Sequence, residues 1–266
     1  MSHESLGGSR ARGWPREVRV QVPSSSDRQR GQGTLLGRAV LAFWSDVAPE
    51  HEDGFNDWYT NEHLPERVGV PGFLRGRRYV KTDDSQAVQK YFTLYETESL
   101  ATLSSASYLE RLDNPTPWTQ KMVPLFLNSN RVAYAIGASI GGGIGGWMAT
   151  VEFGPQPDAA DELRSSLAQR TLPSLLDEPD VTGCALGEAD LDTTSAKDGT
   201  AEGRDADGGS EVAASWILFV EGARSSVVDI AEARLLGPDG LSRHGALEEV
   251  ALKPYRLMFS LADRPI

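Results

Sequence analysis

Cysteine and long apolar runs are nearly missing from this chain of 266 residues. The single cysteine, Cys184, excludes an internal disulfide, which is typical of proteins that work in the reducing cytoplasm. The longest stretch of apolar and small residues, 132–150, is interrupted by glycines and falls short of the about 20 apolar residues that a membrane helix needs. Residues 1–17 lack the apolar core of a secretory signal. We therefore expect a cytoplasmic protein with no membrane partner.

Metal ligands and excess positive charge are also scarce. The four histidines are scattered, and no H-x-E, H-x-x-x-H or C-x-x-C spacing occurs, so we expect no metal site. The net charge of −12 argues against a nucleic-acid partner, because neutralising phosphates requires a basic surface. Residues 188–211 carry eight acidic side chains against Lys197 and Arg204, so this one segment supplies half of the net charge.

Glycine is abundant only where it suggests a connection. Residues 141–146, GGGIGG, satisfy the G-x-G-x-x-G pattern of dinucleotide-binding proteins. That pattern requires a helix directly afterwards, whereas residues 147–153 are apolar and β-branched and predict a strand. The glycines are therefore interpreted as a flexible linker.

The order of predicted elements is strand, helix, strand, strand, helix, strand, and it occurs twice. In the first round, residues 99–112 form the second helix, with Ser99 as the expected N-cap. The short connection at residues 83–87 makes the preceding two strands an antiparallel hairpin. The expected strands are 38–47, 73–81, 89–98, 131–137, 147–153, 182–190, 216–221 and 255–262, and the other expected helices are 54–70, 158–176 and 225–236.

The two rounds align at constant offsets. His63-Leu64-Pro65 corresponds to Thr171-Leu172-Pro173, 108 residues later, whereas the segments that start at Tyr91 and Asn130 correspond to segments 125 residues later. The difference falls in the acidic stretch, which we interpret as an insertion in the second copy. We therefore predict a disordered tail (1–36), a first unit (37–138), a linker (139–146) and a second unit (147–266) with an acidic insertion at 188–211.

Residues 55–80 hold most of the candidate chemistry. Phe55, Tyr59 and His63 are spaced to share one helix face, and Pro65 predicts that the helix ends or kinks near His63. On the next strand, alternation separates Arg78 from Arg75 and Arg77. An exposed basic strand is the expected arrangement; an inward Arg78 would need Glu62, Glu96 or a ligand carboxylate as its partner.

The first unit resembles the EthD-like family of the dimeric α/β-barrel superfamily. The matching residues are Asp57-Trp58-Tyr59, Glu62-His63, Pro65 and Val70-Pro71-Gly72-Phe73. The resemblance covers about residues 38–138 and implies an α+β fold, here two tandem ferredoxin-like βαββαβ units with antiparallel sheets packed face to face. Relatives include cofactor-free monooxygenases, polyketide cyclases, isomerases, decarboxylases, haem proteins and proteins with no known activity, so the resemblance implies a fold rather than one reaction.

Three functions remain open from the sequence. The first is a cofactor-independent enzyme that performs proton-transfer chemistry (cyclisation, isomerisation, decarboxylation or oxygenation) on an aromatic or polyketide-like small molecule. The second is a non-catalytic ligand-binding or structural protein, in which His63 only caps a helix end and the fold forms a homodimer interface. The third is a haem protein that uses His63 or His244. For the first, the predicted catalytic residues are His63 and Tyr59, and the predicted substrate-binding residues are Trp58, Asn61, Arg78 and Trp118.

Overall fold

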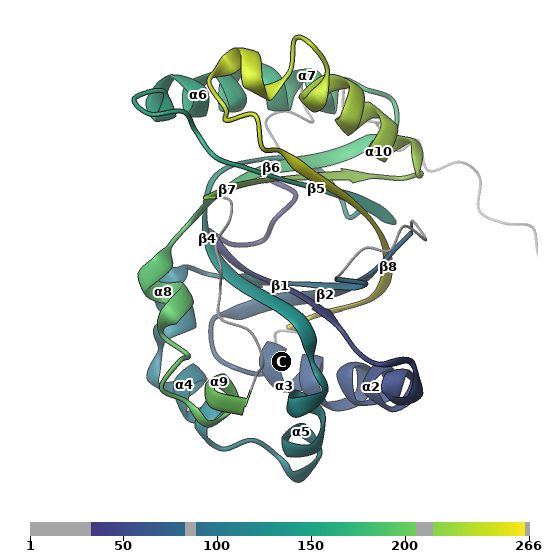
Figure 1. Cartoon of the computed structure of the whole chain (residues 1–266), viewed down its shortest axis with the longest axis vertical. Coiled ribbons are helices and arrows are strands. Elements are labelled where there is room, and N and C mark those ends of the chain that lie inside the picture. Colours follow the sequence, from purple (N-terminus) through teal and green to yellow (C-terminus); the bar gives the residue numbers. More distant parts are fainter. Residues whose placement is uncertain (1–32, 83–88, 206–214, 264–266) are drawn as a thin grey trace, which may run out of the picture.

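A closed antiparallel barrel forms the centre of the molecule (Figure 1). The computed structural model describes residues 33–82, 89–205 and 215–263. Within these residues, neighbouring strands follow the order β1-β3-β2-β8-β5-β7-β6-β4. The strands are β1 (Ala39–Asp46), β2 (Phe73–Lys81), β3 (Tyr91–Thr97), β4 (Leu127–Gly141), β5 (Trp147–Phe153), β6 (Val181–Ala189), β7 (Trp216–Gly222) and β8 (Ala251–Ala262).

Helices cover the barrel on two opposite sides (Figure 1). On one side lie η1 (Pro49–His51), α2 (Glu52–Trp58), η2 (Tyr59–His63), α3 (Leu64–Val68), η3 (Leu100–Ser104), α4 (Ala106–Asp113), α5 (Pro117–Met122) and η4 (Val123–Leu125). On the other lie α6 (Ala160–Ser166), η5 (Leu167–Thr171), α7 (Leu172–Leu176), α10 (Ser226–Ala231), η6 (Glu232–Leu236) and η7 (Leu241–His244). None of the helices in the described segments is long and apolar enough to span a membrane.

Each half of the chain contributes one four-stranded sheet. The first half pairs its strands in the order β4-β1-β3-β2, and the second half repeats this order as β8-β5-β7-β6. The pairs β2–β8 and β4–β6 join the two sheets and close the barrel. The predicted hairpin of β2 and β3 is confirmed. Every residue of β3 and β7 is buried, because one face of each strand lines the barrel and the other lies under helices.

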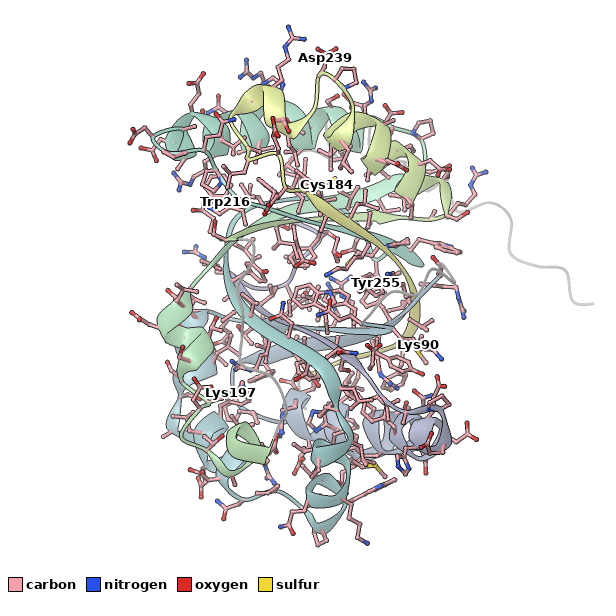
Figure 2. All side chains as sticks on the ribbon, in the orientation of Figure 1. Lys90, Cys184, Lys197, Trp216, Asp239 and Tyr255 are labelled. Atoms are coloured by element: carbon pink, nitrogen blue, oxygen red, sulfur yellow. The ribbon has the colours of Figure 1, made fainter. Side chains whose placement is uncertain are left out.

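Three hydrophobic cores follow from this arrangement. The barrel interior is filled by side chains from all eight strands, including Trp44, Phe92, Phe219 and Tyr255. Figure 2 shows Tyr255 between the two sheets and Cys184 on the other face of its strand, toward the helices of the second half. The remaining two cores lie between each sheet and its own helices.

The barrel interior also holds buried charges, which corrects the expectation of an exposed basic strand. Arg77 is fully buried and lies 2.9 Å from Glu96 and 2.8 Å from Glu221 through its Nε and Nη1 atoms. Arg75 donates to both carboxylate oxygens of Glu96 at 2.8 Å. The expected alternation is present, with Arg78 on the opposite face, but both faces of β2 are buried. Opposite charges in direct contact offset the cost of burying them.

Two predicted details differ in the structure. Ser99 stands at the N-cap position of η3, but its side chain makes no capping hydrogen bond to the described backbone; Ser105 accepts a hydrogen bond from the Tyr108 amide and begins α4. Residues 33–36 do not belong to a disordered tail, because Thr34 and Leu35 are buried and Thr34 donates to Glu221. The rest of the predicted tail, residues 1–32, lies outside the described residues.

The acidic insertion extends from the second sheet to the helices of the first half. Its described part forms α8 (Leu191–Ser195) and α9 (Ala201–Asp205), which run along the side of the barrel from the end of β6 toward α4 (Figure 1). Residues 206–211 of the predicted insertion lie outside the described residues. The insertion therefore connects the two halves and does not project from the second half alone.

Candidate functional site

A cavity of about 70 Å³ lies between the first half's sheet and its helices. Its apolar wall consists of Leu41, Phe43, Leu112, Val123 and Phe126, and its polar wall consists of Tyr59, His63, Arg67, Tyr95, Tyr108, Arg131, Lys197, Glu202 and Gly203. The wall thus combines residues of the helix that precedes β2, the outer face of the sheet, α4 and the acidic insertion. An apolar site with a few convergent polar groups is typical of small-molecule binding.

A π-helical turn positions the two predicted catalytic residues. The sequence predicted that Pro65 would end or kink the helix near His63. The helix instead continues through η2 into α3, with the Leu64 amide donating to the carbonyl oxygen of Tyr59. The wider turn accommodates a proline that lacks an amide proton and would clash with a carbonyl four residues earlier. It also places Tyr59 and His63 at its two ends, both in the cavity wall.

His63 is buried with an unused hydrogen-bonding atom. Its ring centroid lies 4.3 Å from that of Trp58 and 4.9 Å from that of Tyr59. Its Nδ1 atom is buried and makes no hydrogen bond to any described residue. Burial, together with the nearby charges of Arg67 and Arg78, holds the pKa of His63 well below its ordinary value. The imidazole is therefore neutral near pH 7, with a lone pair available to accept a proton or a hydrogen bond.

The tyrosines around His63 are hydroxyl donors rather than phenolates. Burial raises the pKa of Tyr59, and it raises the pKa of Tyr95 well above the ordinary range. Tyr108 also lines the cavity, from α4. Three phenol groups therefore face a small space that contains one neutral imidazole, an arrangement that suits an oxygen-bearing ligand.

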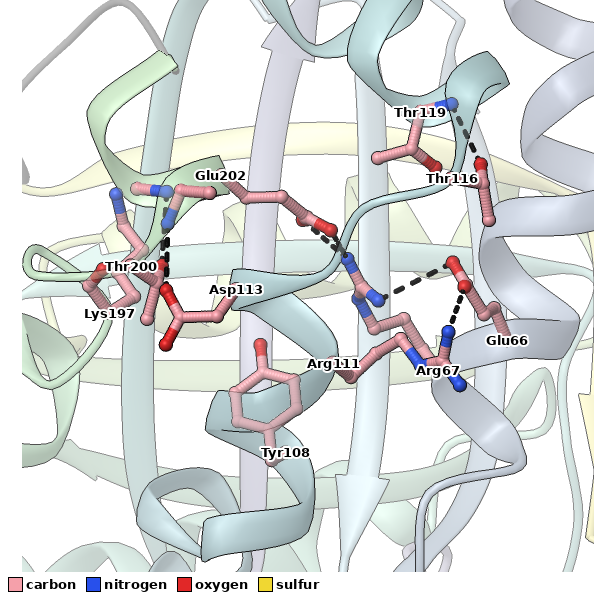
Figure 3. Close-up of polar contacts among 12 residues, drawn as sticks. Glu66, Arg67, Tyr108, Arg111, Asp113, Thr116, Thr119, Lys197, Thr200 and Glu202 are labelled. Carbon is pink, nitrogen blue, oxygen red and sulfur yellow. Dashed lines mark hydrogen bonds and ion pairs between the residues drawn. The ribbon is translucent and has the colours of Figure 1, made fainter.

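An ion pair between the two halves forms part of the cavity wall (Figure 3). The Nη2 atom of Arg67, on α3, donates to both carboxylate oxygens of Glu202, on α9, one of them at 2.5 Å. Burial alone would lower the pKa of Arg67, but the charge of Glu202 raises it, so the guanidinium stays charged. Burial also raises the pKa of Glu202 despite this partner. Burial of the Glu202 carboxylate therefore costs desolvation free energy, which the contact with Arg67 offsets only in part.

Two further cations reach the cavity. Arg131, at the start of β4, donates to the carbonyl oxygen of Thr194 on α8 at 2.8 Å. Lys197 lies between α8 and α9, and burial together with the charge of Arg131 lowers its pKa. With Arg67, these residues supply three cationic groups against the single carboxylate of Glu202 among the lining residues. The cavity therefore favours an anionic ligand, although the chain as a whole is acidic.

The four predicted substrate-binding residues lie outside the cavity wall. Trp58 packs on His63 and donates through Nε1 to Thr119, so it supports the site from behind. Arg78 lies among the rings of Phe55, Tyr59 and Tyr91, with its guanidinium 4.3 Å from the centroid of Tyr59.

Neither of the remaining two predicted substrate-binding residues lines the cavity. Asn61 is exposed and donates to Asp57 at 2.6 Å. Trp118, on α5, packs at the edge of the first half's helical core. Arg78 has no hydrogen bond within the described segments, and neither Glu62 nor Glu96 is its partner. Cation–π contacts take the place of the expected carboxylate.

The second half has different side chains at the aligned positions. Leu167, Thr171 and Leu175 occupy the positions of Tyr59, His63 and Arg67, and both leucines belong to the second half's hydrophobic core. Thr171 and Leu175 border a wider, open groove that is also lined by residues from α6, η6 and η7, including the exposed His244. Within the described parts of the chain, no group of three or more potential ligand side chains could hold a metal ion.

Sequence reasoning missed most of the polar cavity wall. Arg67 could have been found, because it lies one helical turn after His63 on the same face. Tyr95 and Arg131 follow from strand alternation once the outer face of the sheet is known. Lys197 and Glu202 carry no such signal, since only the tertiary path of the insertion brings them to the first half.

The fold has counterparts among solved structures. An anthrone oxidase-like protein shares 10% identity over 84% of this chain and 92% of its own, with a TM-score of 0.54. A provisionally assigned monooxygenase of Fusobacterium nucleatum shares 10% over 87% and 98% (TM-score 0.53), and a provisionally assigned chlorite dismutase shares 10% over 84% and 96% (TM-score 0.51). No protein-family model and no curated protein sequence matches the chain.

At these identities the likeness concerns the fold alone. These neighbours belong to the dimeric α/β-barrel superfamily, and the chain has that fold within a single polypeptide.

Proposed function

We propose that this protein is a cofactor-independent enzyme in which neutral His63 removes a proton from a small aromatic or polyketide-like substrate. One observation carries the proposal: a buried imidazole with an unbonded Nδ1 atom in a cavity lined by aromatic and cationic side chains. A purely structural histidine would satisfy its buried nitrogen atoms with protein partners.

The environment of His63 limits the reaction that it can perform. A base with a depressed pKa removes only relatively acidic protons, such as those of a phenol or of a methylene group next to a carbonyl. The enolate or phenolate that forms would be stabilised by Arg67 and by the hydroxyl groups of Tyr59 and Tyr95. Such an anion is the common intermediate of cyclisation, isomerisation and cofactor-free oxygenation.

The structure suggests roles for the other predicted residues. Tyr59 would donate a hydrogen bond to the substrate oxygen. Trp58 would position His63 through their ring contact, and Arg78 would keep the imidazole neutral by charge repulsion. Asn61 and Trp118 would not contact the substrate, because neither lines the cavity.

The organisation of the chain supports an internal duplication of a ferredoxin-like unit. β2 begins at Phe73 and β6 at Val181, 108 residues apart, and both π-helical turns precede a Leu-Pro pair at the same offset. β3 and β7 begin 125 residues apart, at Tyr91 and Trp216. We infer a first unit near 37–138 and a second unit at 147–266; of the predicted linker at 139–146, residues 139–141 complete β4. The EthD-like relationship, homodimerisation and the cytoplasmic location stay predictions.

Haem was the third function left open by the sequence. A porphyrin does not fit beside His63, because the imidazole is packed against the rings of Trp58 and Tyr59. His244 is exposed on η7 and offers no enclosed pocket. We derive no step that involves haem.

Deuterium exchange tests proton abstraction without knowledge of the natural product. Anthrone and the smaller ketone 2-tetralone each carry an acidic methylene group. In oxygen-free D₂O, the protein should accelerate deuterium incorporation there, as followed by NMR. His63→Gln should abolish the acceleration, whereas His244→Gln should retain it. Equal acceleration by His63→Gln would refute the assigned base. Binding of these ketones without any exchange would instead support a non-catalytic ligand-binding protein.

A further inference from the structure

We propose that Arg67 binds the carboxylate of an aromatic acid and that Glu202 of the insertion occupies this position until the ligand displaces it. This inference rests on the proposed site and names its substrate class. The carboxylate of Glu202 already marks where a ligand carboxylate would lie, because Arg67 holds it at the wall of the cavity.

The pairing leaves part of Arg67 unused. Only Nη2 donates to Glu202, whereas Nη1 is buried and makes no hydrogen bond within the described chain. Glu66 forms an ion pair with Nη1 through its Oε2 atom at 3.6 Å, too long for a hydrogen bond, while its Oε1 atom accepts a hydrogen bond from Arg111. A guanidinium binds a carboxylate best through two nitrogen atoms at once. A ligand in the cavity could engage both, which the tethered Glu202 does not.

The two helices of the insertion are attached unequally. Thr194 of α8 is fixed on β4, where it accepts hydrogen bonds from the Ala133 amide and the Arg131 guanidinium. Among the described side chains, α9 is held to the first half by the Arg67–Glu202 pair and by one hydrogen bond from the Ala201 amide to Asp113, and its backbone lies near α4 and η4 (Figure 3). A short helix with few anchoring contacts opens at low free-energy cost. α9 can therefore move while α8 remains in place.

The charge balance selects the ligand. When Glu202 leaves, Arg67, Arg131 and Lys197 remain around tyrosines and apolar side chains, with no acidic group among the other described lining residues. A small aromatic carboxylate matches both the charge and the apolar wall. The ligand carboxylate would also replace the Glu202 carboxylate as the partner of Arg67.

The test compares salicylate, an aromatic carboxylate, with phenol, which lacks the carboxylate, by calorimetric titration. Glu202→Gln should bind salicylate about tenfold more tightly than the unmodified protein, because the competing closed form is weakened. Glu188→Gln, which removes a carboxylate from the half-exposed pair with Arg164, should leave the affinity unchanged. Phenol should bind all these proteins alike.

The double variant Arg67→Gln/Glu202→Gln identifies the anion-binding residue without leaving a buried charge unpaired. It should bind salicylate at least about tenfold more weakly than Glu202→Gln does. Unchanged affinity in Glu202→Gln would overturn displacement, and equal affinity in the two Glu202 variants would overturn the role of Arg67. Either result can occur while His63-dependent exchange of the neutral ketones persists, so failure here is distinct from failure of the proposed reaction.

Discussion

Glu96 and Glu221 lie at corresponding positions of the two halves, 125 residues apart, and meet on the same guanidinium inside the barrel. Arg77 bridges them with distances of 2.9 Å and 2.8 Å, although its own counterpart in the second half is Ala185. One arginine thus pairs with one carboxylate from each half. The positive charge that joins the two carboxylates inside the barrel comes from the first half.

Removing Arg77 should destabilise the protein strongly. Arg77→Leu leaves two buried carboxylates with fewer positive partners, and breaking a buried ion pair from one side costs about 3–5 kcal/mol. We expect a loss of this size in the free energy of unfolding, measured by urea denaturation. Arg164→Leu removes an arginine that pairs with Glu188 near the surface and should cost no more than about 1 kcal/mol. Similar losses in both variants would contradict the bridging role.

Stability should fall in mild acid because of His63. Unfolded His63 binds its proton with an ordinary pKa of about 6.5, whereas the native pKa is well below that value. Between the two values the unfolded state carries more protons, so the free energy of unfolding rises with pH. Urea denaturation at pH 7.5 and 5.5 should show this dependence, and His63→Gln should reduce it. A variant that keeps the full pH dependence would place its origin elsewhere.

Trp58 should report on ligand binding. Its ring contacts His63 directly at the back of the cavity, while Trp216 lies in the second half's core. We expect salicylate to change the tryptophan fluorescence of the unmodified protein and of Trp216→Phe, but much less that of Trp58→Phe. Calorimetric titration, which does not depend on fluorescence, should show that Trp58→Phe still binds salicylate. An undiminished signal in Trp58→Phe would place the ligand outside the described cavity.

Amide hydrogen exchange should separate the two helices of the insertion. We expect residues 197–203 to exchange much faster than residues 190–195, because Thr194 anchors α8 to β4 by two buried hydrogen bonds. Glu202→Gln should accelerate exchange in residues 197–203 and leave residues 190–195 unchanged. Mass spectrometry of peptides from the two segments provides the measurement. Uniformly slow exchange across both would indicate that α9 does not open.

The positions of the strands could be predicted from the sequence. Alternation and β-branched residues placed the starts of four strands at 73, 182, 89 and 216, within two residues of the observed starts at Phe73, Val181, Tyr91 and Trp216. These features are local, or repeat along the chain, so pattern and propensity suffice.

The details that failed depend on tertiary contacts. The helix predicted over 54–70 continues past Pro65 to Val68, but the sequence did not indicate that the irregularity near His63 would be a π-helical turn. Arginines on a strand normally face solvent, but Arg77 finds Glu221 from the other half. Neither the π-helical turn nor the burial of Arg77 can be derived from the local sequence. The turn depends on how the helix packs, and Glu221 lies on a strand that is distant in the sequence.

The site itself could be predicted only in part. His63 and Tyr59 share a helix face and lie together in the cavity wall, as their spacing indicated. The position of Asn61 two residues before His63 suggested proximity, but at that spacing a helix turns the side chain away. Glu202 lies 135 residues from Arg67 in a segment that the sequence indicated only as an acidic insertion.

Because α8 and α9 follow a second-half strand and cover a first-half cavity, the two halves of the chain cannot be separated without opening the site. An isolated first half would expose the edges of β2 and β4 and lose one side of its cavity. Three residues of the cavity wall, Lys197, Glu202 and Gly203, lie in this segment. Substitutions there would therefore change ligand preference while the helix that holds His63 stays unchanged.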